Sequence, residues 1–161
     1  MAELGSTAFE SLLLRIAADY PYIQLIESSK FSWHSRKNSV TYKKSIEDTG
    51  EDVLALLHEV GHALLYHKAY TYDFELLQLE IAAWEKAREL ANHYGNETAL
   101  NEDYVQDCLD TYRDWLHLRA TCPICFARSL QNSSSHYQCF NCRTEWRVSR
   151  SRLCRPYRLQ T

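Results

Sequence analysis

The chain has 161 residues, of which 45% are hydrophobic and 24% are charged, and these values are ordinary for a soluble globular protein. It contains no run of about 18 apolar residues, so we expect no membrane span. The first residues lack the basic-then-apolar pattern of a secretory signal. We therefore expect a cytoplasmic protein, and in that reducing compartment cysteines more often bind metal than form disulfides.

Charge is distributed unevenly along the chain. Residues 1–118 carry 10 Lys and Arg against 20 Asp and Glu, whereas residues 119–161 carry eight arginines and a single acid, Glu145. A change of sign of this kind indicates a boundary between two parts of different character. The sequence therefore predicts one domain over residues 1–118 and a second, smaller one over residues 119–161.

The first domain is expected to belong to the α+β class. Apolar residues at helical spacing, with capping and stop signals, predict helices over residues 7–19, 52–68, 73–94 and 102–118. Short alternating stretches predict a strand over residues 22–26 and an antiparallel hairpin over residues 30–44, with its turn at residues 36–38. The expectation is a small antiparallel hairpin or sheet with about four helices.

The helix over residues 52–68 carries His58-Glu59-Val60-Gly61-His62, the H-E-x-x-H pattern of zinc-dependent hydrolases. On a helix, residues four apart lie about 40° apart around the axis and about 6 Å apart along it, so both imidazoles reach one ion. Glu59 is rotated by about 100° from His58, which lets it face a water at the ion without binding the metal. The alternative is an amphipathic helix with two chance histidines.

A catalytic zinc ion usually has three protein ligands, so a third one is needed after His62. Glu80 is the first candidate, because it lies within the apolar stripe of the following helix, where an unpaired carboxylate is costly. Glu85 comes second, and Glu75 and His93 stay open. His67 is five residues after His62, about 140° around the same helix, so we expect it to point away from the metal.

Four cysteines form two C-x-x-C pairs in the second domain, and 13 residues separate the pairs. Such paired knuckles are a strong signal for a structural zinc ion held by all four thiolates, Cys122, Cys125, Cys139 and Cys142. So small a β module, a zinc ribbon, has little core and depends on the metal to fold.

The second domain is also rich in arginine without lysine, which suits phosphate or carboxylate recognition. Tyr137, Phe140 and Trp146 offer rings on which bases could stack. The sequence leaves three partners open for this segment, namely a nucleic acid, an acidic protein or the acidic first domain. The candidate contacts are Arg143, Arg147, Arg150 and Arg152.

Two segments, Leu57-His58-Glu59-Val60-Gly61-His62-Ala63-Leu64-Leu65 and Glu80-Ile81-Ala82-Ala83-Trp84, resemble the gluzincin metallopeptidases. Over roughly residues 20–95 the chain is most similar to the ImmA/IrrE-type metallopeptidases. It departs from that pattern at Ala82, where many relatives carry a second acid. The SprT-like proteases also join the motif to a C-terminal zinc ribbon and are the second choice, because their third histidine has no well-placed counterpart here.

The resemblance implies a zincin-like metallopeptidase domain followed by a four-cysteine zinc ribbon, with one catalytic and one structural zinc ion. By that match His58, His62 and Glu80 bind the catalytic zinc and Glu59 is the base. The expected activity is cleavage of a specific intracellular protein, with the ribbon positioning the substrate, a partner or nucleic acid. The alternative is a catalytically inactive adaptor that binds nucleic acid or protein through its ribbon.

Two further features follow from the expected peptidase chemistry. An edge strand of such folds pairs with an extended substrate, and the strand that precedes the motif helix, residues 39–43, is the candidate. An oxyanion stabiliser is also needed. The residues available for it are Tyr66, Tyr70, Tyr72, Tyr94 and His93.

Overall fold

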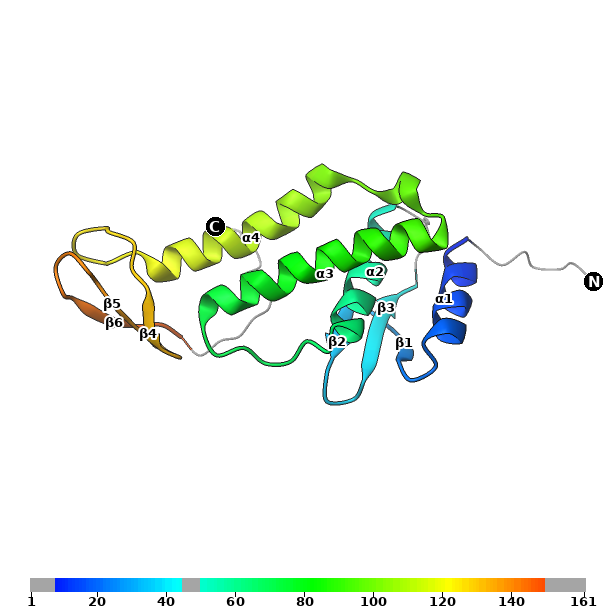
Figure 1. Ribbon diagram of the computed structural model, residues 1–161, viewed down its shortest axis with the longest axis horizontal. Helices are drawn as coiled ribbons and strands as arrows, with labels where there is room; N and C mark the ends of the chain where they lie inside the picture. Colours follow the sequence, from blue (N-terminus) through cyan, green and yellow to red (C-terminus); the bar gives the residue numbers. More distant parts are fainter. Residues whose placement is uncertain (1–7, 45–49, 150–161) are drawn as a thin grey trace, which may run out of the picture. The chain divides into compact units, whose positions relative to one another are not determined.

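The structure, a computed structural model, describes residues 8–44 and 50–149 (Figure 1). These residues form two compact units, one of residues 8–44, 50–68 and 82–104 and the other of residues 69–81 and 105–149. One helix, α3 (Asp73–Tyr94), runs without a break through the division at residue 81. Four α-helices and two small sheets confirm the α+β class, while the predicted boundary after residue 118 stays a prediction.

The helices of the first unit begin close to their predicted starts. α1 (Ala8–Asp19) buries Phe9, Leu12 and Ile16, the residues at helical spacing that face the core. α2 (Gly50–Leu64) is buried at every position from Val53 to Ala63, so the motif helix is part of the core rather than a surface helix. It ends at Leu64, earlier than the predicted end at residue 68. A short 3-10 helix, η1 (Glu97–Ala99), was not predicted.

The sheet of the first unit is mixed, with strand order β1-β3-β2. β1 (Gln24–Ser28) runs parallel to β3 (Ser39–Lys43), and β2 (Ser32–His34) runs antiparallel to β3 as the predicted hairpin. α2 packs against β2 and β3, as Figure 1 shows. The prediction that residues 39–43 form an edge strand is wrong, because β3 uses both its edges to pair with β1 and β2. β1 occupies one edge of β3 along its whole length, and β2 occupies the other edge over residues 39–41.

Close packing of α2 against residues 82–94 of α3 fixes the motif helix within the first unit. A Cβ atom built on Gly61 would lie 2.8 Å from the carbonyl oxygen of Ala83, a separation shorter than van der Waals contact allows. Next to this contact the ring of Trp84 packs on His58, with the ring centroids 4.1 Å apart. The motif glycine therefore serves the approach of two helix backbones.

The second unit combines residues 73–81 of α3, most of α4 (Glu102–Ala120) and the segment of residues 121–149, which we call the ribbon. Its helical part has a small apolar core of Tyr70, Leu76 and Tyr112, which Leu77, Leu79 and Trp115 flank. The ribbon contributes an antiparallel sheet of β4 (Gln131–Ser133), β5 (His136–Gln138) and β6 (Glu145–Arg147). Segments far apart in sequence thus share one compact body.

A buried ion pair joins the parts of the second unit. Asp73, 2% exposed at the start of α3, accepts hydrogen bonds from Nε of Arg119 at 2.7 Å and from the Tyr137 hydroxyl at 2.8 Å. Its backbone amide donates to Oε1 of Gln131 at 2.7 Å. The Arg119 carbonyl in turn accepts from Nε1 of Trp146 at 2.9 Å. Both helices and the ribbon therefore meet at one carboxylate–guanidinium pair.

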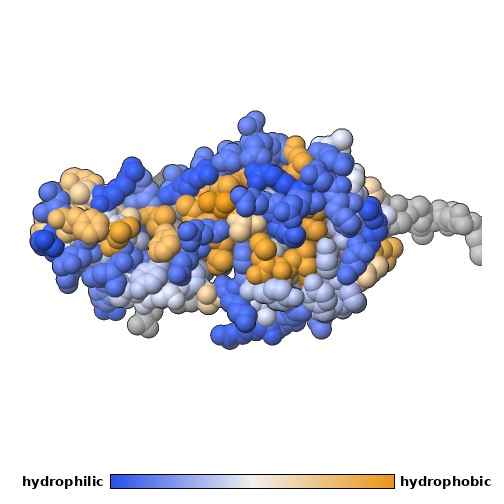
Figure 2. All heavy atoms as spheres, in the orientation of Figure 1, coloured by the Kyte–Doolittle hydropathy of each residue, from blue (hydrophilic) through white to orange (hydrophobic). Residues whose placement is uncertain are grey.

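The second unit also contains an apolar cavity of about 400 Å³, whose walls come from α3, α4 and the ribbon. Figure 2 shows apolar residues at the surface over the ribbon, and the large exposed ones in this segment are Ile124, Phe126, Leu130 and Phe140.

Among the described residues no helix combines the length and the apolar character needed to span a bilayer.

Candidate metal centres

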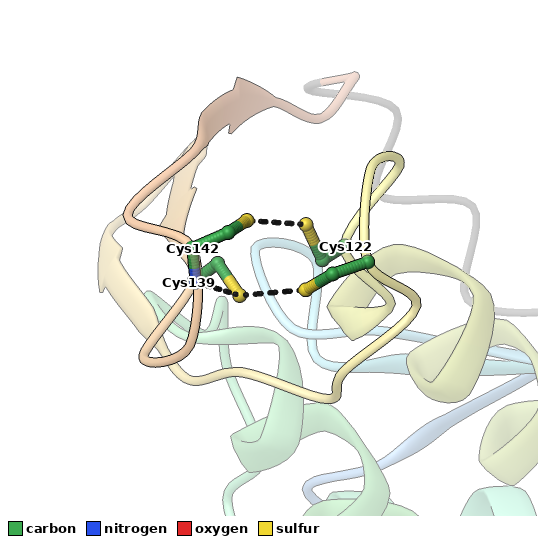
Figure 3. A group of neighbouring side chains, drawn as sticks. Cys122, Cys139 and Cys142 are labelled. Atoms are coloured by element: carbon green, nitrogen blue, oxygen red, sulfur yellow. Dashed lines mark hydrogen bonds between the residues drawn. The ribbon is translucent and has the colours of Figure 1, made fainter.

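The four ribbon cysteines converge on one point. Their sulfur atoms all lie within 4.8 Å of one another, and Figure 3 shows the Cys122, Cys139 and Cys142 sulfurs turned inward. The Sγ atoms of Cys122 and Cys142 are 3.6 Å apart and those of Cys125 and Cys139 are 3.4 Å apart. A tetrahedral zinc ion about 2.3 Å from each sulfur would separate them by about 3.8 Å. The four cysteines therefore fit a metal ion in tetrahedral geometry.

The turn around Cys139 also prepares that sulfur for metal binding. Backbone amides of Cys142 and Asn141 donate hydrogen bonds to its Sγ at 3.5 and 3.4 Å. These bonds, the one from Cys142 being the stronger cause, lower the pKa of Cys139 to about 6, against the opposing effect of desolvation. Because the thiolate is the form that binds metal, the knuckle favours the ligand state near neutral pH.

The second cluster consists of His58, His62 and Glu80, whose ligand atoms also lie within 4.8 Å of one another. The two Nε2 atoms are 3.0 Å apart, close to the roughly 3.3 Å that two nitrogens take around a tetrahedral zinc ion. Exposure is 2% for His58, 8% for His62 and 4% for Glu80. Two imidazoles and a carboxylate buried together fit a divalent cation. Binding that cation would offset the cost of removing the three side chains from water.

Glu59 lies on the same buried turn of α2 and is only 6% exposed. It is not among the three clustered ligand residues. Glu59 thus lies on the same helix as the two clustered histidines without being one of the three clustered residues. A carboxylate there is shielded from bulk water.

The other candidates for the third ligand are engaged or distant. Glu75 accepts the amides of Tyr72 and Thr71, which lower its pKa and make it a cap at the start of α3. Glu85 is exposed. His93 lies 13 residues beyond Glu80 on one continuous helix, a separation of about 20 Å at 1.5 Å per residue.

The same helical distance removes Tyr94 and His93 from the set of oxyanion stabilisers. The Tyr94 hydroxyl donates to Asp19 at 2.9 Å, and burial together with this bond raises its pKa. His93 lies 3.7 Å from the same carboxylate. Both residues thus belong to the far end of α3, about 20 Å along the helix from Glu80.

His67 lies differently from its predicted position. As expected, His67 is not one of the three clustered residues. The geometric reason given for this is wrong, since it assumed a helix through residue 67, whereas α2 ends at Leu64. The chain turns back, and Nδ1 of His67 lies 2.8 Å from Nδ1 of His62. His67 contacts the ring nitrogen of His62 opposite the one that faces His58.

The ribbon's predicted base-stacking residues divide into two kinds. Tyr137 is 1% exposed and its ring stacks on Trp146 at 5.4 Å, so its predicted role as a stacking platform is wrong. Phe140 is 65% exposed. Of the candidate arginines, Arg143 and Arg147 are described, whereas Arg150 and Arg152 lie outside the described residues.

Comparison of the chain with protein-family models, with curated proteins and with solved structures finds no match. The resemblance to the gluzincin metallopeptidases thus rests on the sequence motif alone.

Proposed function

We propose that this chain is a zinc-dependent endopeptidase that cleaves an intracellular protein, with a second, structural zinc ion in the ribbon. The observation that carries the proposal is the buried cluster of His58, His62 and Glu80 beside the buried Glu59. Local helix geometry supplies the first two residues, but Glu80 comes from another helix. A structural helix with chance histidines has no need of a buried acid at that place.

Each residue then has a defined task in peptide hydrolysis. Zinc held by the three side chains would act as a Lewis acid on a water and on the scissile carbonyl. The Glu59 carboxylate accepts one proton from the attacking water and delivers it to the amide nitrogen that leaves. One water is consumed, and the products are a carboxylate and an amine.

A substrate strand has β2 as its partner in this proposal, in place of the predicted β3. β2 is an edge of the sheet, contacts α2, and pairs on its other side with β3. Trp33 of β2 donates from Nε1 to the carbonyl oxygen of His67 at 2.8 Å, which ties this edge to the chain just after the motif helix. An extended peptide could add to β2 through main-chain hydrogen bonds.

Glu59→Gln tests the proposal, because it keeps the shape of the side chain and removes the base. With the two-zinc protein and a denatured cell lysate, mass spectrometry of new amino termini should show a loss of cleavage of about 100-fold or more. Glu51→Gln is the matched control, since Glu51 is an exposed glutamate at the start of the same helix.

The results separate the two candidate functions. Equal cleavage by wild type and Glu59→Gln would contradict the proposed mechanism. If the wild-type protein holds two zinc ions and still produces no new amino termini, the result would favour the inactive adaptor.

A further inference from the structure

The motif helix ends in a turn that directs the next residues back over it. The amide of Tyr66 donates to the carbonyl of Ala63 at 3.1 Å, and the amide of His67 donates to the carbonyl of His62 at 3.0 Å. Tyr66 has a positive φ of 54°. These are the two bonds and the left-handed residue of a Schellman motif, in which the residue after the left-handed one lies over the last helical turn.

Two departures from the usual form of this motif concern function. Glycine normally holds the left-handed position, because a Cβ atom there lies too close to the following carbonyl oxygen. The residue that lies over the helix is usually apolar, but here it is His67. An imidazole thus sits where a plain helix stop would have an aliphatic side chain.

His67 is held on both sides. Its ring lies edge-on to that of His62, with centroids 4.9 Å apart, an interplanar angle of 71° and the two Nδ1 atoms 2.8 Å apart. Its carbonyl oxygen accepts from Nε1 of Trp33 in β2 at 2.8 Å. The ring is half-buried. The placement of His67 therefore follows from the helix stop and from the sheet.

The proton positions follow from the two contacts of His62. Its Nε2 faces Nε2 of His58 in the ligand cluster, and a nitrogen that binds metal cannot keep its proton. A neutral His62 then carries its proton on Nδ1 and donates it to Nδ1 of His67. His67 accepts there and keeps its own proton on Nε2. With both rings neutral, this placement of the protons leaves Nε2 of His62 able to bind a metal and makes the contact between the two Nδ1 atoms a hydrogen bond.

We propose that His67 is a positioning residue of the metal centre, which fixes the ring orientation and the tautomer of the ligand His62. The inference rests on the proposed function only for the zinc site, and it does not require peptidase activity. Ligand histidines commonly donate their second ring N–H to such a partner, whose loss weakens metal affinity by about 10–100-fold.

Cobalt(II) titration of the full chain, with zinc left in the ribbon, measures the affinity of the histidine–glutamate cluster. A four-thiolate cobalt site gives sulfur-to-metal charge-transfer absorption that the cluster lacks, so filling of the wrong site is visible. His67→Phe keeps a ring over the helix and removes the acceptor, and it should weaken cobalt binding by about 10–100-fold. His67→Asn restores a side-chain oxygen acceptor and should recover most of the affinity.

Two controls separate positioning from folding. His93→Phe makes the same chemical change at an exposed histidine about 20 Å along α3 from Glu80 and should leave cobalt affinity unchanged. The unfolding midpoint of the metal-free protein should be the same for wild type and His67→Phe, since a merely structural role would lower it.

Unchanged cobalt affinity of His67→Phe, or a loss that His67→Asn does not recover, would overturn the inference while leaving the zinc site in place. A wild-type chain that takes up no metal beyond the ribbon ion would instead overturn the proposed function, and this inference with it.

Discussion

At the scale of single residues, the motif combines two kinds of requirement in five positions. His58 and His62 are ligand candidates, whereas Gly61 between them has no side chain that could bind a metal. Its role is spatial, because the carbonyl of Ala83 would lie 2.8 Å from any Cβ placed there. The same contact brings α3, and with it Glu80, close to the two histidines.

Gly61→Ala is therefore expected to destabilise the protein although alanine is the better helix former. Helix propensity favours alanine by about 1 kcal/mol. The added methyl meets backbone that cannot rotate away, and overpacking of this kind costs about 1–3 kcal/mol. Urea unfolding of the metal-free protein should show a lower midpoint and, in the same variant, weaker cobalt binding at the histidine–glutamate cluster. A midpoint at or above that of wild type would show that α2 and α3 separate freely.

At the scale of elements, a buried ion pair links the helices of the second unit to the ribbon. The side chains of Asp73 and Arg119 are 3% and 12% exposed. The Asp73 carboxylate also accepts a hydrogen bond from Tyr137, and the backbone carbonyl of Arg119 accepts one from Trp146. Another Arg–Asp pair of the same unit, Arg113 with Asp110, is 43% and 59% exposed. The two pairs share chemistry and differ in burial.

Asp73→Asn should destabilise the second unit by about 3–5 kcal/mol, because it leaves a buried guanidinium without its counter-charge. Asp110→Asn is the matched control and should cost less than about 1 kcal/mol, since the exposed pair is screened by water. Guanidinium-chloride unfolding of the zinc-loaded protein, followed by the fluorescence of its tryptophans, compares the two. Similar costs for both variants would mean that burial does not decide the strength of the Asp73–Arg119 pair.

At the scale of the whole molecule, the two candidate metal centres stand in different kinds of surroundings. The histidine–glutamate cluster is embedded among buried residues of α2 and α3. The ribbon has three short strands and few buried apolar side chains besides Tyr137, so bonds from a metal ion to the four sulfurs would replace a core. Loss of metal should therefore affect the two centres unequally.

Removal of both metals by a strong chelator should unfold the ribbon and leave α1, α2 and the first sheet folded. In a nuclear magnetic resonance amide spectrum, signals of residues 121–149 should collapse while those of residues 8–44 stay dispersed. Cys122→Ser should produce the same pattern with zinc present, because only three of the four thiolates would remain to hold the ion. A dispersed ribbon spectrum after complete metal removal would contradict a folding role for this ion.

The elements that follow from local rules were predicted well from the sequence. The bounds of α3 match the prediction at both ends, and the hairpin of β2 and β3 formed as expected. Histidines four apart on a helix and cysteines three apart in a turn are placed by backbone geometry within a few residues, so their spacing alone predicts two groups of converging ligands.

Tertiary structure decided what depends on distant parts of the chain. The parallel pairing of β1 put β3 in the centre of the sheet, packing against the Asp73 network buried Tyr137, and the end of α2 at Leu64 returned His67 to His62. Glu80 joined the histidines because α2 and α3 pack at Gly61. Contacts of this kind arise from the competition of whole surfaces for burial, which no short pattern of residues encodes.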